Sequence, residues 1–158
     1  MTKFHSGLEE LIAKQLDDSK LNYRFEELRI YYNKEDNQKS FYRPDFVLEN
    51  GIIVEVKGQF VTKDRKKHKL IRKQYGDKYD IRFVFSNPNQ KVGKKSNTSY
   101  ADWCNLYGFK YAKEKIPQEW LEERKIMKRK TMKDFEAELE INPYASISAK
   151  ELVELEDV

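Results

Sequence analysis

Cysteine and histidine are scarce in this sequence, and long apolar runs are absent. Cys104 is the single cysteine among 158 residues, so no disulfide can form within the chain, and the protein fits a reducing compartment. Only His5 and His68 are present, which leaves zinc clusters and histidine-based nuclease motifs with little support. No apolar run approaches the length of a membrane span, and no secretory signal is visible at the start. We therefore expect a cytoplasmic protein with no membrane partner.

The composition predicts one compact domain with a small core that depends on aromatic side chains. Apolar residues make up 39% of the chain and charged residues 37%, while ten tyrosines, nine phenylalanines and two tryptophans supply the bulk. The length suits one such domain, with room for a tail. Cys104 is expected to be a small buried hydrophobe within the core.

The charge is unevenly distributed along the chain. Residues 134–158 hold eight acidic side chains and one lysine, a net charge of −7. Residues 1–133 hold 30 basic and 19 acidic side chains, a net charge of +11. A body this basic favours a polyanionic partner, with nucleic acid first. The acidic tail has two interpretations: a solvated terminus that increases solubility, or a segment that folds over a DNA-binding face and competes with phosphate.

Residues 44–58 carry the pattern with the most chemistry. They predict two short strands around a turn, with Asp45, Glu55 and Lys57 at positions that can share a face. Two converging carboxylates repel each other unless a cation lies between them. Carboxylate oxygens are the ligands that Mg²⁺ prefers, and a nearby lysine suits water activation at a phosphate. This grouping indicates metal-dependent hydrolysis of a phosphodiester.

The turn decides whether Asp45 lies opposite Glu55. A two-residue turn at 50–51 would put Asp45 on the wrong face, whereas a three-residue turn at 49–51, with a left-handed Gly51, pairs Asp45 with Glu55. The second register also separates an apolar face from the face that carries Asp45, Glu55 and Lys57, so we predict it. The apolar face would hold Phe46, Leu48, Ile52, Val54 and Val56, and the other would add Val47 and Ile53. The alternative is an ordinary hairpin whose charges lie on a solvated face.

The rest of the chain predicts an α/β arrangement. The expected elements are a helix from residue 6, a strand at 23–32, a polar linker or exposed bridge at 33–40, a basic helix at 63–73, a buried strand at 81–85, a loop at 86–99, a helix at 100–106, a short strand at 109–111, a helix at 117–120 and a basic helical segment at 122–133. The helix at 63–73 either contacts DNA or presents a solvated face, and the loop at 86–99 either contacts phosphates or is mobile.

Several separate motifs resemble the phage endonuclease I family, in the same order along residues 4–121. They are Ser6-Gly7-Leu8-Glu9, Tyr42-Arg43-Pro44-Asp45-Phe46, Asn50-Gly51-Ile52, Val54-Glu55-Val56-Lys57-Gly58, Asp64-Arg65-Lys66-Lys67-His68, Arg82-Phe83-Val84-Phe85-Ser86, Thr98-Ser99-Tyr100 and Ile116-Pro117-Gln118-Glu119-Trp120. That family resolves Holliday junctions with a restriction-endonuclease-like α/β fold, in which helices flank a mixed sheet. The acidic C-terminus departs from the family pattern.

The resemblance implies roles for individual residues. Asp45 and Glu55, with the backbone carbonyl of Val56, would bind Mg²⁺, for which Mn²⁺ can substitute, with two ions per site. Lys57 would orient or activate the attacking water, and Glu9 would complete the site. No small-molecule cofactor is implied.

The resemblance also implies an intertwined homodimer acting on branched DNA, in the host-cell cytoplasm if the gene belongs to a phage. Residues 1–133 would form the nuclease domain, with 6–32 exchanged between subunits and 33–40 as the bridge, so that Glu9 would serve the partner's site. Residues 134–158 would be the acidic tail. Candidate contacts to DNA are Lys63, Arg65, Lys66, Lys67, His68, Arg72, Lys94 and Lys95.

Two further interpretations stay open from the residues alone. Ser6 and Glu9 also match a capping box, in which the Glu9 carboxylate would serve only the start of the helix. For the whole chain, the alternatives to a junction nuclease are a non-catalytic nucleic-acid-binding module and a nuclease of the same fold that cuts plain duplex DNA or transposon ends.

Overall fold

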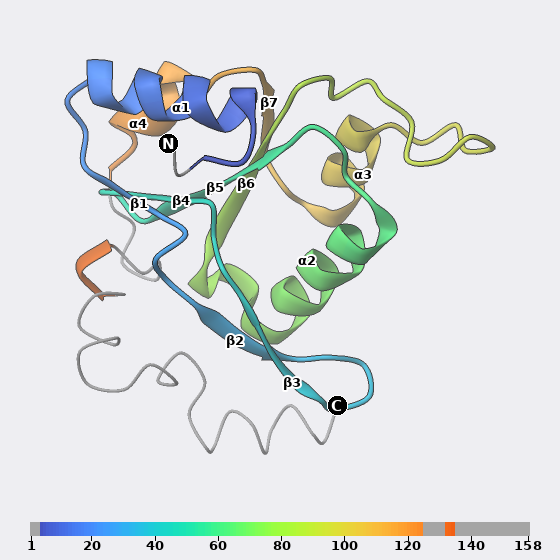
Figure 1. Cartoon of the computed structure of the whole chain (residues 1–158). Helices are drawn as coiled ribbons and strands as arrows, with labels where there is room; N and C mark the ends of the chain where they lie inside the picture. The colour runs from blue at the N-terminus through green and yellow to red at the C-terminus, as the bar shows by residue number, and fades with distance from the viewer. Residues whose placement is uncertain (1–3, 125–131, 135–158) are drawn as a thin grey trace.

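A five-stranded mixed sheet with helices on both faces forms the centre of the molecule (Figure 1). The computed structural model describes residues 4–124 and 132–134. The sheet has the order β1-β4-β5-β6-β7, and β5 pairs antiparallel with β4 but parallel with β6. Its strands are β1 (Tyr23–Phe25), β4 (Phe46–Leu48), β5 (Ile52–Lys57), β6 (Asp80–Phe85) and β7 (Tyr111–Lys113). The fold is thus mixed α/β, as the sequence predicts.

The hairpin of β4 and β5 has the predicted register. Phe46 pairs with Val54 and Val47 with Ile53, which places Asp45 opposite Glu55. Gly51 has a φ of +89°, and its N–H donates to the Leu48 carbonyl at 2.9 Å. This left-handed conformation favours glycine because any side chain there is strained. The three-residue turn is therefore confirmed.

The two faces of the sheet carry two separate apolar clusters. Helices α1 (Gly7–Asp18) and α4 (Gln118–Glu122) cover one face, and α2 (Thr62–Tyr75) and α3 (Tyr100–Tyr107) cover the other (Figure 1). A 3₁₀ turn at Gly76–Lys78 follows α2. The first cluster includes Phe46, Leu48, Ile52, Val54 and Val56, and the second includes Val47 and Ile53. The predicted division of hairpin side chains is confirmed.

The single strand predicted at 23–32 is wrong, because the chain turns at Glu26. Its φ of +52° ends β1, and the chain resumes as β2 (Ile30–Asn33) in a separate two-stranded sheet with β3 (Lys39–Tyr42). The segment 33–40 is therefore mostly a hairpin and not an irregular linker. A left-handed Asn37 and the bond from the Lys34 N–H to the Gln38 carbonyl at 2.8 Å close its turn.

Most of the other predicted elements are confirmed. The helices at 63–73 and 100–106 lie within α2 and α3, and the strand at 81–85 lies within β6. The short strand is displaced to β7, because Phe109 packs into the core beside Trp103 and does not join the sheet. Cys104 is buried, as expected. Much of the basic segment 122–133, and the acidic tail beyond Asp134, lie outside the described residues.

Two polar contacts join distant parts of the chain. The Gln15 side chain donates to the Ile116 carbonyl at 2.7 Å and accepts from the Ile116 N–H at 2.9 Å, which anchors α1 to the segment before α4. Arg82 is almost fully buried on β6 and bonds both Asp80 and Glu123.

Among the described residues, no helix has the length and apolar character needed to cross a bilayer.

Candidate active site

Asp45 and Glu55 are held together by the backbone of the β4–β5 hairpin. The Asp45 N–H donates to Glu55 Oε1 at 2.9 Å, and the Val56 N–H donates to Asp45 Oδ2 at 2.9 Å. Each carboxylate therefore accepts a backbone bond from the strand that carries the other. This lock fixes both side chains in place, as the register predicts.

Glu55 is the most enclosed carboxylate of the site. Only 2% of its surface is exposed, and the hydroxyl of Tyr42 donates a hydrogen bond to Oε1. Its Oε2 lies 3.8 Å from Lys57 Nζ and 3.9 Å from His68 Nε2. Tyr42 belongs to a motif singled out from the sequence but received no role there. Nothing in the sequence pattern around Tyr42 indicated that its hydroxyl would contact Glu55.

Lys57 lies at the end of β5, between two carboxylates. Its Nζ is 3.4 Å from Asp64 Oδ2, on the first turn of α2, as well as close to Glu55. Burial acts to lower the pKa of Lys57, but the nearby carboxylates, chiefly Glu55 and Asp64, raise it by more. The ammonium group is therefore charged and held at the mouth of the carboxylate pair.

The carboxylates of Asp45 and Glu55 lie close enough to repel each other. Burial, followed by repulsion from Glu55, raises the pKa of Asp45 to about 9. The Val56 N–H and Lys57 oppose this rise without cancelling it. Two buried carboxylates this close are best satisfied by a cation between them. Hard divalent ions such as Mg²⁺ prefer such oxygen ligands.

Glu9 approaches the same site from the first turn of α1. Its backbone N–H donates to the Ser6 Oγ at 3.1 Å, so Ser6 caps the helix. One carboxylate oxygen of Glu9 lies 3.4 Å from the Ser6 hydroxyl, while Oε2 is buried without a hydrogen-bond partner. Burial, more than the repulsion from Glu26, raises the pKa of Glu9. Capping thus uses the backbone of Glu9 and one carboxylate oxygen, and leaves Oε2 without a hydrogen-bond partner.

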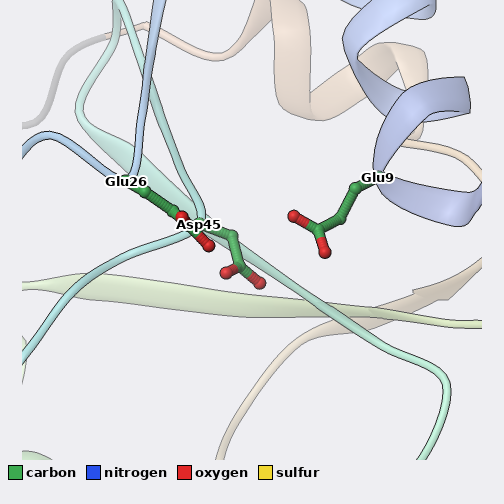
Figure 2. A group of neighbouring side chains, drawn as sticks. All are labelled: Glu9, Glu26 and Asp45. Atoms are coloured by element: carbon green, nitrogen blue, oxygen red, sulfur yellow. The ribbon is translucent and has the colours of Figure 1, made fainter. Parts of the chain in front are cut away.

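Glu26 is a site residue that the sequence did not reveal. Carboxylate oxygens of Glu9, Glu26 and Asp45 all lie within 4.8 Å of one another, and Figure 2 shows Glu9 extending toward Asp45 with Glu26 beside it. Glu26 falls inside a segment whose alternation predicts a strand, and no spacing rule links it to Asp45. With the buried, unpartnered oxygen of Glu9, these donors fit a hard divalent cation.

The basic residues predicted to contact DNA divide into three groups. Lys63, Lys66, Lys94 and Lys95 are exposed, and Lys67 is half-buried beside Asp64. Arg65 and Arg72 are engaged by the protein itself: Arg65 donates to the Phe60 carbonyl, and Arg72 lies over the Phe109 ring. His68 is fully buried against Tyr42 and Phe83. The prediction that His68 contacts DNA is wrong, because no phosphate can reach it.

The buried His68 is neutral, and its Nε2 lies 3.9 Å from Glu55 Oε2. Burial, followed by Lys67 and Lys57, lowers its pKa well below the ordinary value. Sequence reasoning placed it on a basic helix face, but it falls on the apolar stripe of α2 with Ile71. Its spacing of three from Ile71 was the signal that could have found this.

Two arginines and an exposed phenylalanine form a surface patch that the sequence did not predict. Arg29 lies 4.9 Å and Arg43 lies 5.8 Å from the centre of the Phe41 ring. Phe41 is 45% exposed, and both arginines are exposed. Arg43 precedes Asp45 by two residues along the chain. Stacked rings and guanidinium groups are suited to nucleic acid.

A depression of about 360 Å³ lies between the β2–β3 turn and the start of α2. It is lined by Lys34, Lys63, Lys66 and Lys67, together with Tyr32, Glu35, Asp36, Asp64 and Leu70. Because Asp64 also contacts Lys57, this lysine-bordered surface continues to the carboxylate site.

Comparison with known proteins finds two similar phage nucleases and a matching family. The chain is 44% identical over 122 residues to "Endonuclease I" of Escherichia phage T7, which covers 77% of this chain and 80% of that protein. It is 43% identical over 122 residues to "Endodeoxyribonuclease 1" of Enterobacteria phage T3, which covers 77% of this chain and 79% of that protein. These relatives place the chain among the nucleases. A sequence model of the phage endonuclease I family matches residues 1–138, and the chain belongs to that family.

Proposed function

We propose that the protein is a structure-selective DNA endonuclease that resolves four-way junctions by metal-dependent hydrolysis of a phosphodiester. The observation that carries this proposal is the locked group of Asp45, Glu55 and Lys57 beside the buried, unpartnered oxygen of Glu9. The carboxylates supply a cation site, and Lys57 supplies a fixed positive charge. Family membership supports a nuclease but does not name the substrate.

Asp45, Glu55 and the carbonyl of Val56 would hold Mg²⁺, with Mn²⁺ as a substitute. When bound, such an ion polarises a phosphate oxygen and lowers the pKa of a coordinated water. A second ion would lie toward Glu9. The Tyr42 hydroxyl and the Asp45 N–H orient Glu55, while the Val56 N–H orients Asp45. These bonds keep the ligands ready before substrate arrives.

Lys57 would offset negative charge on the phosphate and orient the attacking water. Its ammonium group is already fixed by Asp64 and Glu55, so little reorganisation is needed on binding. The exposed lysines of α2, Lys94 and Lys95 of the loop, and the patch of Arg29, Phe41 and Arg43 would contact the DNA backbone. Such contacts position DNA and give affinity that falls with salt.

The substrate proposal requires two active sites in one assembly. A two-fold homodimer suits paired cuts on opposed strands of a junction. In the restriction-endonuclease-like arrangement that we propose, residues 6–32 are exchanged between subunits and 33–40 form the bridge. Glu9 and Glu26 would then come from one chain and Asp45 from the other. The exchange requires the β2–β3 hairpin turn to open.

A cleavage assay tests the activity. Purified protein with Mg²⁺ is incubated with a four-way junction and with a linear duplex of matching sequence. We expect paired cuts in the junction, little cutting of the duplex, and no cutting by Asp45→Asn. Equal cutting of both substrates would indicate a general duplex nuclease. Junction binding without cutting would indicate a non-catalytic DNA-binding module.

Subunit exchange has its own test. Glu9→Gln and Asp45→Asn chains are each inactive as homodimers if both residues act in the site. In an exchanged heterodimer, one site carries both substitutions and the other carries neither, so co-expression restores nicking. Without exchange, each site keeps one substitution and the mixture stays inactive.

A further inference from the structure

We infer that Glu26 is a ligand of the second divalent cation, which it holds together with Glu9 and Asp45. This inference rests on the metal-dependent hydrolysis proposed above and adds a residue to it. Asp45 would be shared between two ion positions: one toward Glu55 and the other toward Glu9 and Glu26. The three observations that follow are independent of one another.

The first observation is the convergence of three carboxylates from three separate segments. Glu9 lies on α1, Glu26 follows β1 and Asp45 precedes β4, yet an oxygen of each lies within 4.8 Å of an oxygen of the other two (Figure 2). Like charges gathered in this way oppose folding unless a cation offsets them. Three oxygen donors at this separation suit Mg²⁺ or Mn²⁺, with water completing the coordination.

The second observation is the buried oxygen of Glu9. Glu9 is 7% exposed, and its Oε2 accepts no hydrogen bond. A buried carboxylate oxygen without a donor is unfavourable, because it has lost its hydration without gaining a hydrogen bond. The other oxygen of Glu9 already contacts Ser6. Oε2 therefore has no hydrogen-bond partner, on a residue whose carboxylate lies within 4.8 Å of those of Glu26 and Asp45.

The third observation is the backbone of Glu26. Its φ of +52° is a left-handed conformation that residues with a side chain adopt at a cost. The conformation is held by the bond from the Glu26 N–H to the Asp45 carbonyl at 3.0 Å. Glycine would adopt this turn more easily. The chain instead places a carboxylate there, tied to the residue that both ions would share.

His5 is the present partner of Glu26. Its Nε2 lies 2.9 Å from Glu26 Oε2, and 68% of the His5 side chain is exposed. An exposed pair of this kind contributes little stability, so it does not account for a strained glutamate at this position. A divalent cation would compete with His5 for the same oxygen.

Mn²⁺ binding to the full-length protein, measured by titration calorimetry without DNA, tests the inference. Glu26→Gln is compared with Glu27→Gln, since Glu27 is the next residue, is exposed and pairs with Arg24 at 2.8 Å. We expect wild type and Glu27→Gln to bind two Mn²⁺ per chain. Glu26→Gln should bind one ion normally and the other about tenfold or more weakly.

Further variants distinguish the role of Glu26 as a metal ligand from the proposed function as a whole and from a simple pair with His5. Asp45→Asn should weaken both ions; if it changes neither, the proposed metal-dependent function fails as well. If Asp45→Asn weakens Mn²⁺ binding while Glu26→Gln matches Glu27→Gln, only the role of Glu26 is overturned. His5→Ala should leave Mn²⁺ binding intact or make it tighter. If Glu26 served only to pair with His5, His5→Ala and Glu26→Gln would change Mn²⁺ binding to the same extent.

Folding is checked on the same samples by thermal unfolding. Glu26→Asn serves as a second variant, because asparagine tolerates a left-handed backbone. Its side chain is one methylene shorter than that of glutamate and carries no charge. It should fold as wild type does and lose the second ion. A folded Glu26→Asn protein that binds two Mn²⁺ with wild-type affinity would overturn the inference.

Discussion

The hydroxyl of Tyr42 donates its hydrogen bond to the same oxygen of Glu55 that accepts the backbone N–H of Asp45. Tyr42 is 1% exposed, and burial, followed by Glu55, raises the pKa of its phenol well above the ordinary value. Tyr42 is therefore a donor at every working pH. It turns Oε1 of Glu55 toward the hairpin and leaves Oε2 toward Lys57 and His68.

Tyr42→Phe should slow cleavage while preserving the fold. The change removes one of two bonds that orient Glu55, and we expect kcat to fall about tenfold with a smaller change in KM. The free energy of unfolding should fall by about 1 kcal/mol, since the Asp45 N–H still satisfies Oε1. Single-turnover cleavage of a junction measures the effect, with Tyr107→Phe on α3 as control. Equal rates for both variants would contradict a positioning role.

Asp45→Asn should stabilise the metal-free protein, and more so at high pH. The folded pKa of Asp45 is raised to about 9 from 3.8, so the folded state keeps a proton that the unfolded state loses. The resulting destabilisation is absent below the unfolded pKa and grows as pH rises toward the folded pKa. At about 1.4 kcal/mol per pH unit, the variant should gain about 4 kcal/mol over wild type between about pH 5 and about pH 8.

Thermal unfolding in a chelator at these two pH values measures that difference. Added Mg²⁺ should then raise the melting temperature of wild type and leave Asp45→Asn nearly unchanged, because a ligand stabilises only the state that binds it. A pH-independent gap between the two proteins would contradict the raised pKa.

Arg43→Ala should weaken junction binding in a salt-dependent way. Arg43 is exposed beside Phe41 and two residues before Asp45, where DNA entering the site would pass. Loss of one phosphate contact should reduce the slope of log affinity against log salt by about one. Binding titrations at several salt concentrations measure this slope, with Lys14→Ala on the exposed side of α1 as control. An unchanged slope for Arg43→Ala would remove this patch from the DNA interface.

Arg82→Met should destabilise the fold without entering the chemistry. Arg82 is 1% exposed and makes four bonds of 2.8–2.9 Å to Asp80 and Glu123. Removing Arg82 breaks these four charge-assisted bonds in a partly buried network, at a cost of about 2–4 kcal/mol. The matched control is Arg24→Met, whose pair with Glu27 is exposed and should contribute less than about 1 kcal/mol. Urea unfolding compares them, and equal losses would contradict a buried ion-pair role.

The sequence could predict the centre of the site because local rules determine it. Alternation along two strands and a single glycine at the turn were enough to place Asp45 opposite Glu55. The sequence predicts a polar linker or exposed bridge at 33–40 and not a hairpin, since the turn of this segment depends on a left-handed Asn37 and contains no glycine to mark it.

The remaining site residues depend on tertiary packing. Glu26 reaches the carboxylates only because the chain bends between two sheets, and the alternation around it argues for an unbroken strand. His68 looked like one more charge on a basic helix, but the stripe that packs on the sheet includes it. Tyr42 and Arg43 lie in a motif that the sequence singled out. Their roles depend on their contacts in the folded chain, with Glu55 for Tyr42 and with Phe41 for Arg43.

The reciprocal bonds between Gln15 and Ile116 have a consequence for biosynthesis. The two bonds that tie the helix of Glu9 to the segment before α4 cannot form until residue 116 has left the ribosome, long after Asp45 and Glu55 have emerged. A nascent chain would thus hold an incomplete cutting centre during most of translation. Nearby nucleic acid would be spared until the polypeptide is nearly finished.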